Sequence, residues 1–571
     1  MAGGDILRGF GVELREPHPR LELARRLREV GRHHSAGAAP RGPEIDRDRN
    51  VVFTGMTVEI GRGQVGRLAD EELPLAMAAD RRVGKAGFRQ PVDGIAVGAH
   101  DVQGGIHGAA MGEVVLRRWV PRRGFTSPGK RAGGVMIASM RYRLTDIPAM
   151  LGTPAGRRQV ADGIAYRLWP VMSRLARLYR RTIARRTRVV AVVGSFGKST
   201  TTRAVAATLA APQPTSMTAN AWTSVAMAIL RIRPSQRHAA IEVGIGGRGQ
   251  MEQYARLVRP DLTVVTSIGS EHHGSLGSLD VTREEKSRMI AAMPDAGIAV
   301  LNGDDRNVLA MKAHAPGRVI AFGFGPGCDV RAEHIRLDWP HGTRFQLEAF
   351  GQRREVAIRL VGRQMVYPVL AAISVALAEG VDLDEALARV RPLPPTPGRM
   401  EPVPLANGAI VLRDDYKSTL ETIHAALEVL AEIPAPRRVV LFGDLSEPQG
   451  HERPIYLALG IRAARVASRL VVIGRGFRRY WAGARRAGMP RSAVVDGGRT
   501  VQEAAAVLQK ILQPGDVLLL KGRRPQKLDR VRMILQGRSV RCDIPFCDIR
   551  SMECENCPML ERGWGRHRVI M

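Results

Sequence analysis

The segment GSFGKSTTT, residues 194–202, holds a lysine framed by glycines and followed by hydroxyl side chains. Glycines let the backbone turn sharply, so that successive N–H groups can point at phosphate oxygens, and a helix that follows adds its positive end. The lysine supplies a positive charge to the β- and γ-phosphates, and the next hydroxyl suits Mg²⁺. The loop therefore predicts ATP binding, and the expected contacts are Gly194, Ser195, Gly197, Lys198, Ser199 and Thr200.

A carboxylate follows the next apolar run. In AAIEVGIGGRG, Glu242 stands at the end of a candidate strand. The carboxyl ends of parallel strands face the ligand crevice of an open α/β sheet, and Mg²⁺ prefers oxygen ligands. A glutamate at a strand end is usually a surface residue, but its place after a phosphate loop makes Glu242 a candidate magnesium ligand.

The elements that must position these groups alternate along the chain. Over residues 188–388, apolar β-type runs alternate with helical patterns, which predicts a mostly parallel sheet covered by helices. The Pro-rich link RPLPPTPGR (391–399) precedes a second series. The expected fold class is α/β, with a P-loop central domain and a smaller Rossmann-like C-terminal domain over 389–540. The expected strands are RVVAVVG, HAAIEVG, DLTVVTSIG, GIAVLNG and RVIAFGFG in the first domain, and AIVLRDD, RRVVLFGD, RLVVIGRG and DVLLLKG in the second.

The N-terminal segment is irregular. Residues 1–135 hold scattered Gly, Arg and His without a lasting helical or alternating period. Two interpretations stay open: a disordered basic arm, or a segment that is not genuine coding sequence, with translation starting at Met136 or Met140. The second is favoured.

Residues 136–187 form a basic helical segment, with an amphipathic helix predicted over 161–188. The favoured interpretation is a packed helix with a solvated basic face. The alternative is a helix that makes peripheral contact with a membrane surface.

The bulk composition limits the function classes. The 571 residues carry a net charge of +31, but only nine residues are Lys and the Arg residues are spread along the chain. With only 5% aromatic residues, a nucleic-acid partner is not expected. No apolar run is long enough to span a bilayer and no secretory signal is evident, so a cytoplasmic location is expected.

The segment TSIGSEHHGSLGSLDVTREEKSRM (266–289) completes a series that resembles the Mur ligases, the ATP-dependent amino-acid and peptide ligases of cell-wall synthesis. That family combines a short GxxGKT/S loop, a glutamate after the second strand, and an H-x-x-x-F-G-S block followed by a lysine. The resemblance implies that Ser199, Glu242, His272 and a carbamylated Lys286 hold Mg²⁺. A carbamate turns a lysine cation into an oxygen ligand for a hard metal.

The resemblance also assigns residues around the nucleotide and the substrates. Asn302 in VLNGDD would contact the nucleotide or a neighbouring helix, and Arg399 would reach the nucleotide on domain closure. In RDDYKSTLET, Asp415 would hold the ribose hydroxyls and Lys417 would approach the γ-phosphate. The residues expected at the catalytic centre are Lys198, His272, Lys286 and Lys417, and those expected near the acceptor and the incoming amine are Asn220, Lys521 and Arg524.

Two parts of the chain depart from the family pattern. No UDP-binding N-terminal domain is evident before residue 188. The family's G-x-H-N-x-x-N-A-x-A-A helix reads GRQMVYPVLAA (362–372), with Gln364, Met365 and Pro368 in place of the histidine and both asparagines. Hydrogen bonds on the adenine side are therefore expected to be lost or moved.

The tail, residues 541–571, is foreign to the family. Cys542, Cys547, Cys554 and Cys557 are spaced C-x4-C-x6-C-x2-C. Cytosolic thiols grouped in this way favour a metal over disulfides, and four thiolates suit Zn²⁺ or an Fe–S cluster. Free thiols in a loose tail are the alternative.

The expected function is an ATP-dependent, ADP-forming carbon–nitrogen ligase that works through an acyl phosphate. The motifs LFGDLSE (441–447) and GDVLLLKGRR (515–524) are most similar to those of the D-alanyl-D-alanine-adding type in peptidoglycan synthesis. The partners would be a cell-wall precursor carboxylate and an amino-acid or dipeptide amine. The alternatives are a Mur-like ligase for a non-UDP carboxylate, such as a lipid-linked precursor or a γ-linked peptide polymer, and a non-catalytic ATP-binding scaffold.

Overall fold

A computed structural model describes residues 50–53, 56–59, 147–214, 220–448, 450–547, 549 and 552–564. The chain divides into two units, Met1–Ser139 and Met140–Met571. In the first, the described residues form one antiparallel hairpin of β1 (Asn50–Phe53) and β2 (Met56–Glu59). The rest of the segment 1–135, with both interpretations of it, lies outside the described residues.

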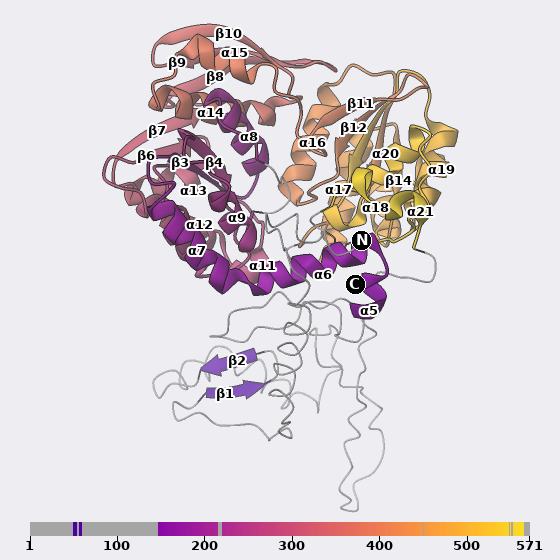
Figure 1. Cartoon of the computed structure of the whole chain (residues 1–571). Helices are drawn as coiled ribbons and strands as arrows, with labels where there is room; N and C mark the ends of the chain where they lie inside the picture. The colour runs from indigo at the N-terminus through magenta and orange to yellow at the C-terminus, as the bar shows by residue number, and fades with distance from the viewer. Residues whose placement is uncertain are drawn as a thin grey trace, which may run out of the picture. The chain divides into compact units, whose positions relative to one another are not determined.

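The central domain is built on an eight-stranded sheet (Figure 1). Strands β3 to β8 pair in parallel, and β8, β9 and β10 form an antiparallel extension. The sheet order is β10-β9-β8-β7-β6-β5-β3-β4. The strands are β3 (Arg188–Val193), β4 (His238–Glu242), β5 (Leu262–Val265), β6 (Ile298–Asn302), β7 (Arg318–Gly323), β8 (Val330–Asp338), β9 (Gly342–Ala349) and β10 (Gln352–Ile358).

Helices cover both faces of this sheet because alternate strand residues bury apolar side chains on opposite sides. Val190 and Val192 of β3 belong to one core cluster, and Val189, Ala191 and Val193 belong to the other. The first face is covered by α8 (Lys198–Thr208), α14 (Val366–Ala378) and α15 (Leu383–Val390). The second is covered by α9 (Thr223–Leu230), α10 (Gln250–Val258), α11 (His273–Leu276), α12 (Leu279–Ala291) and α13 (Arg306–Leu309).

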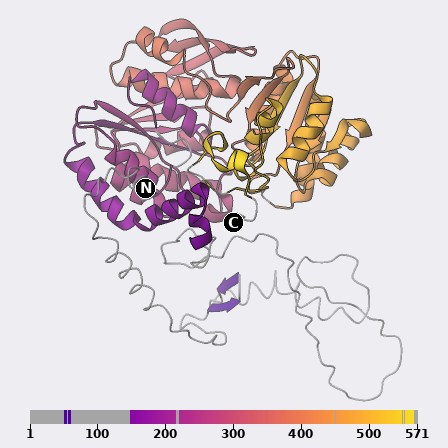
Figure 2. The same ribbon diagram turned by 45° about the vertical axis from the view of Figure 1, so that its right-hand side comes forward.

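The C-terminal domain has its own sheet and two core clusters, shown in orange and yellow in Figure 2. Its order is β11-β12-β16-β13-β14-β15, with only β11 antiparallel. The strands are β11 (Glu401–Pro404), β12 (Ile410–Asp414), β13 (Arg438–Phe442), β14 (Arg469–Val472), β15 (Val494–Asp496) and β16 (Val517–Lys521). The helices are α16 (Leu420–Glu432), α17 (Glu452–Val466), α18 (Phe477–Arg486), α19 (Val501–Ile511) and α20 (Asp529–Leu535). The predicted α/β class with two domains is confirmed.

Three helices precede the central sheet: α5 (Ile147–Leu151), α6 (Pro154–Arg167) and α7 (Trp169–Arg181). The single helix predicted over 161–188 is wrong in its bounds, because two helices meet at Leu168. Pro170 has no N–H to donate, which favours a new helix start there. Helical hydrogen bonds nevertheless continue through the junction, from Leu168 N to Ile164 O (3.1 Å) and from Met172 N to Leu168 O (2.9 Å).

Within the described ranges, no helix combines the length and the apolar character that crossing a membrane requires.

The described part of the C-terminal tail packs against the rest of this unit and contains α21 (Met559–Arg562). Tail residues Cys542, Ile549, Met559 and Trp564 share an apolar cluster with Ala155 of α6. The tail therefore links α6 to the C-terminal domain.

Candidate functional site

The glycine loop lies at the carboxyl end of β3 and leads directly into α8. Gly194 has φ +139°, and a Cβ there would come within 2.1 Å of Thr266 Oγ1. Gly197 is the left-handed N-cap of α8, at φ +82°, with no side-chain cap. The first N–H groups of α8 are thus left to an external acceptor, and the positive end of the helix dipole adds to them. This geometry fits a polyphosphate.

Lys198 and Lys417 meet at this loop although they come from different domains. Lys198 Nζ donates to the carbonyls of Gly194 (2.9 Å) and Ser195 (3.1 Å), and Lys417 Nζ donates to the Ser195 carbonyl (3.2 Å). Both pair with the carboxylate of Glu271, Lys198 at 3.4 Å. Burial lowers the pKa of Lys417 to about 8, although Glu271 acts in the opposite direction.

Glu271 is the anion that balances this group of cations. Burial alone would raise the pKa of Glu271, but the charges of Lys198 and Lys417 hold it well below its usual range. The carboxylate is therefore ionised at neutral pH.

Lys286 reaches the same loop from α12. Its Nζ donates to Ser195 Oγ at 3.0 Å, and the side chain is buried. Burial lowers the pKa of Lys286 well below its usual value, and Lys198 lowers it further. A neutral amine is the form that reacts with CO₂, so this environment fits the expected carbamate.

Glu242, Asn220 and His272 each have a partner in the central domain. Asn220 Nδ2 donates to Glu242 Oε1 at 2.6 Å. His272 has a left-handed backbone (φ 61°) and lies 3.5 Å from Glu271 Oε1. Burial lowers the pKa of His272 to about 4, so its ring is neutral at physiological pH and able to bind a metal.

A second group of predicted residues gathers in the C-terminal domain. Asp415 is buried, and its Oδ1 has no hydrogen-bond partner among the described residues, although Arg413 Nε lies 3.3 Å away. A buried carboxylate whose oxygen has only this charged neighbour still has acceptor capacity, which fits the expected ribose contact. Lys521 is also buried, but it pairs with Asp414 inside the domain.

Tyr416 joins two of the predicted arginines. The guanidinium of Arg399 lies 3.9 Å from the Tyr416 ring centroid and that of Arg524 lies 4.9 Å from it. Such contacts hold guanidinium groups in a fixed orientation. Tyr416 therefore positions both arginines beside the loop that carries Asp415 and Lys417.

Asn302 holds the strand ends together. Its Nδ2 donates to the Thr266 carbonyl at 2.9 Å, and its Oδ1 accepts from Asp304 N at 3.0 Å. The side-chain nitrogen and oxygen of Asn302 thus both have hydrogen-bond partners inside the central domain.

The altered 362–372 segment still forms the start of α14. Tyr367 packs on Phe324 with ring centroids 4.1 Å apart, and its hydroxyl donates to Asp304 at 2.9 Å. Arg363 lies 4.6 Å from the Phe324 ring. The rings of Tyr367 and Phe324 and the charge of Arg363 therefore lie at the start of this helix. The family pattern has its histidine and two asparagines in the same segment.

Sequence reasoning missed Glu271 and Tyr416. Glu271 stands next to His272, and Tyr416 lies between Asp415 and Lys417, so both adjoin predicted residues. Their partners come from distant positions, and only the tertiary structure brings those together.

The expectation of Zn²⁺ or an Fe–S cluster at the tail cysteines is not supported. In the described residues, no three His, Cys, Asp or Glu side chains form a group that could hold a metal ion. The tail thiols are instead packed into small apolar clusters, and Arg530 donates to Cys542 Sγ at 3.2 Å. Among the residues expected to hold Mg²⁺, Glu242 is engaged by Asn220.

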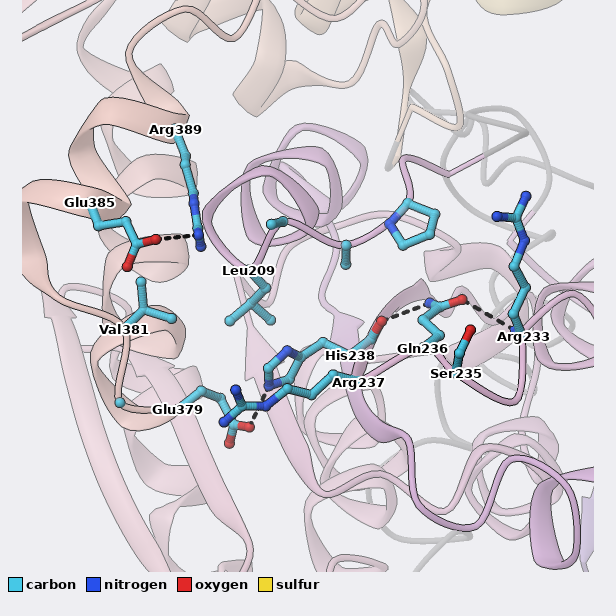
Figure 3. Close-up of a pocket in the computed structure, with 14 residues that line it drawn as sticks. Leu209, Arg233, Ser235, Gln236, Arg237, His238, Glu379, Val381, Glu385 and Arg389 are labelled. Carbon is cyan, nitrogen blue, oxygen red and sulfur yellow. Dashed lines mark hydrogen bonds and ion pairs between the residues drawn. The ribbon is translucent and has the colours of Figure 1, made fainter.

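A cavity of about 480 Å³ lies away from this site (Figure 3). It is lined by residues at the start of β4 and after α8 and α14, at the amino ends of the strands. Inside it, His238 Nε2 lies 2.9 Å from Glu379 Oε2, and Arg188 also binds Glu379. This buried network fastens the sheet to α14 on the edge opposite to the glycine loop.

Comparisons with known proteins agree with this fold and site. The Mur ligase middle domain matches residues 192–376, and the Mur ligase glutamate ligase domain matches residues 398–524. Together the two matches cover more than half of the chain. The chain belongs to the Mur ligase family.

Within that family, the chain is similar to UDP-N-acetylmuramoyl-tripeptide–D-alanyl-D-alanine ligases. It is 31% identical to the enzyme of Escherichia coli K12 over 296 residues, which span 50% of this chain and 65% of that enzyme, slightly less than two thirds. It is 28% identical to the enzyme of Mycobacterium tuberculosis CDC 1551 over 431 residues, which span 68% of this chain and 82% of that enzyme.

Solved structures share the fold. MurF from Acinetobacter baumannii superposes with a TM-score of 0.58 at 24% identity, over 65% of this chain and 81% of that one. MurF from Thermotoga maritima in complex with ADP superposes with a TM-score of 0.56 at 20% identity, over 65% of this chain and 83% of that one.

Proposed function

We propose that this protein is an ATP-dependent ligase that adds D-alanyl-D-alanine to a UDP-N-acetylmuramoyl-tripeptide in peptidoglycan precursor synthesis. The observation that carries the proposal is the convergence of Lys198, Lys286 and Lys417 on Ser195 of the glycine loop. The relatives named for this reaction support the choice of substrates. Because the reaction consumes ATP and a UDP-linked precursor, we expect it to take place in the cytoplasm.

The chemistry requires two displacements. A carboxylate oxygen of the acceptor attacks the γ-phosphorus of ATP, the bond from that phosphorus to the β–γ bridging oxygen breaks, and ADP leaves with an acyl phosphate formed. The amine then attacks the acyl carbon, inorganic phosphate leaves, and the amine loses a proton. The lysines neutralise charge that develops on the phosphoryl oxygens, so catalysis is mostly positioning and electrostatics.

Mg²⁺ would be held by Ser199, Glu242, His272 and a carbamylated Lys286. The donor set fits a hard cation, since it offers a hydroxyl, a carboxylate, a neutral imidazole and the carbamate oxygens. The metal supplies charge neutralisation at the phosphates. Of the protein groups, Asn220 orients Glu242 and Ser195 orients Lys286.

A second candidate function is ligation to a carboxylate that carries no UDP. The observation that favours it is the helical segment α5–α7, which occupies residues 147–181 directly before the central sheet. Its three helices offer no α/β domain for a UDP-linked sugar.

The test is ADP release by the purified full chain with Mg²⁺ and ATP, in the presence of UDP-N-acetylmuramoyl-tripeptide and D-alanyl-D-alanine. We expect release that needs both substrates and falls at least 100-fold in Lys198→Ala, because that change removes the charge at the phosphates. Arg256→Ala is the control, since Arg256 lies on α10 in an exposed ion pair with Glu252.

Two results would contradict the proposal. ADP release that does not respond to the UDP-linked tripeptide would favour the second candidate, and lipid-linked or γ-linked carboxylates would then be tested. Loss of activity in both variants would indicate a folding defect rather than a role of Lys198.

A further inference from the structure

The exposed apolar side chains of the described residues are concentrated on α5–α7 and the turn that follows. Seven of their ten large exposed hydrophobic side chains lie there. These seven are Leu151, Ile164, Leu168, Val171, Leu175, Leu178 and Ile183. Folded proteins rarely leave such a set together on one segment unless it contacts a partner or a membrane.

Five of them form one continuous stripe. Ile164, Leu168, Val171, Leu175 and Leu178 are spaced by four, three, four and three residues, which places them on one helical face. Each is between 44% and 61% exposed. We call these five residues the apolar stripe.

The opposite face of α7 is anchored to the central domain. Trp169 makes edge contacts with Trp222 and Tyr254, at ring-centroid distances of 5.4 and 5.9 Å. Arg180 Nη2 binds Asp261 at 3.0 Å, and the Tyr179 hydroxyl donates to the Ile232 carbonyl at 2.6 Å. The helix cannot turn its apolar stripe inward without breaking these contacts.

Arginines flank the apolar stripe. Residues 163–186 contain seven arginines and no aspartate or glutamate. Arg174, Arg181 and Arg185 are exposed. A helix with exposed apolar residues between basic ones is typical of binding at the interface of an anionic membrane.

We propose that the apolar stripe and its arginines dock this protein on the surface of an anionic lipid bilayer. The charge argues for this occupant over a second copy of the chain, because two such faces would bring arginines against arginines. The surface lies outside the candidate site, so the proposal does not depend on the reaction assigned above.

The test is sedimentation of the purified full chain with vesicles of phosphatidylcholine alone or of phosphatidylcholine with an equal amount of phosphatidylglycerol. We expect binding to the anionic vesicles, weakened by 0.5 M salt, and at least tenfold weaker binding to phosphatidylcholine alone.

The variant Leu175→Asp/Leu178→Asp should bind the anionic vesicles at least tenfold more weakly than the unaltered protein. Arg174→Gln/Arg181→Gln/Arg185→Gln should do the same, because each basic residue near such a surface adds to the attraction.

The matched control is Leu309→Asp/Phe350→Asp, which changes two exposed apolar residues elsewhere and should bind like the unaltered protein. Equal binding by Leu175→Asp/Leu178→Asp would overturn the proposal and place membrane contact on another part of the chain. Equal binding to both vesicle types would overturn it too. A protein dimer that dissociates in Leu175→Asp/Leu178→Asp, without vesicle binding, would identify the stripe as a self-association surface instead.

Discussion

Glu271 pairs with the two lysines that we propose for the phosphates of ATP. Its carboxylate pairs with Lys198 and Lys417, which approach the loop from separate domains. The γ-phosphate of ATP has the same charge sign as this carboxylate. On the proposed assignment it would bind the same two lysines, so we propose that Glu271 competes with ATP.

We expect Glu271→Gln to bind ATP more tightly in the absence of Mg²⁺, because the variant removes a competing charge. A charge-assisted hydrogen bond is worth ~1.5–3 kcal/mol net, so the dissociation constant should fall about tenfold. Calorimetric titration with ATP in EDTA measures it. Glu447→Gln is the control: Glu447 is half exposed and lies 3.8 Å from His272 Nδ1. Weaker ATP binding by Glu271→Gln in EDTA would rule out competition.

At this scale, the sequence could predict a loop and helix start that depend on contiguous residues. The glycine loop and Lys198 are contiguous, and the structure places them at the carboxyl end of β3 and the start of α8, while their contacts with phosphate stay a prediction. Glu271 could not be predicted, because its role depends on Lys417, which is 146 residues away in the chain. The assignment of Lys521 to the incoming amine stays a prediction, since its amine is engaged by Asp414.

At the scale of elements, Arg530 of α20 fastens the C-terminal tail. The side chain is 1% exposed and donates to the carbonyls of Cys542 (2.9 Å) and Ile544 (2.7 Å). Gln502 adds hydrogen bonds to the carbonyls of Val540 and Cys542. The tail is thus held through its backbone, which needs no particular cysteine chemistry.

Arg530→Gln should loosen the tail, because the Ile544 carbonyl loses its donor and the Cys542 carbonyl keeps only Gln502, and a buried polar group without a partner costs ~1–3 kcal/mol. We expect faster proteolysis within 541–564, followed by mass spectrometry, and a lower unfolding midpoint. Arg538→Gln is the matched control: its ion pair with Glu561 has side chains 37% and 59% exposed, and such pairs contribute ~0–1 kcal/mol. Equal cleavage of both variants would mean that surface ion pairs, rather than Arg530, hold the tail.

The predicted strands of both parallel sheets are present because continuous apolar runs bounded by glycines leave few alternatives. The antiparallel strands β8–β10 were missed. Their residues alternate between buried and exposed, with charged side chains such as Arg331, Glu333 and Glu348, so no continuous apolar run marks them. The tail was misjudged for another reason: cysteine spacing suggests ligands, but packing against α6 and α20 decides where the thiols lie.

At the scale of the whole molecule, the central and C-terminal domains meet at the candidate site. Thr200 of α8 lies 3.0 Å from Thr396 of the Pro-rich link. Glu421 of α16 accepts from Ser270 N (3.0 Å) and Ser270 Oγ (2.8 Å), next to Glu271. Lys417 lies at the glycine loop beside these contacts, so the proposed catalytic group is complete only while the domains are together.

Glu421→Ala should therefore slow ADP formation without preventing ATP binding, because the glycine loop lies wholly in the central domain. Exposed contacts of a charged group are worth ~0.2–1 kcal/mol each. Loss of both, about 1.4 kcal/mol, predicts about a tenfold lower kcat/KM and a change of less than threefold in the dissociation constant of ATP. Glu428→Ala is the control on the same helix, since Glu428 pairs with Arg462 inside the C-terminal domain. If both variants keep full activity, the Ser270–Glu421 contact does not hold the domains together during the reaction, and other contacts between them, such as Val361 packed in the apolar cluster of the C-terminal domain, suffice.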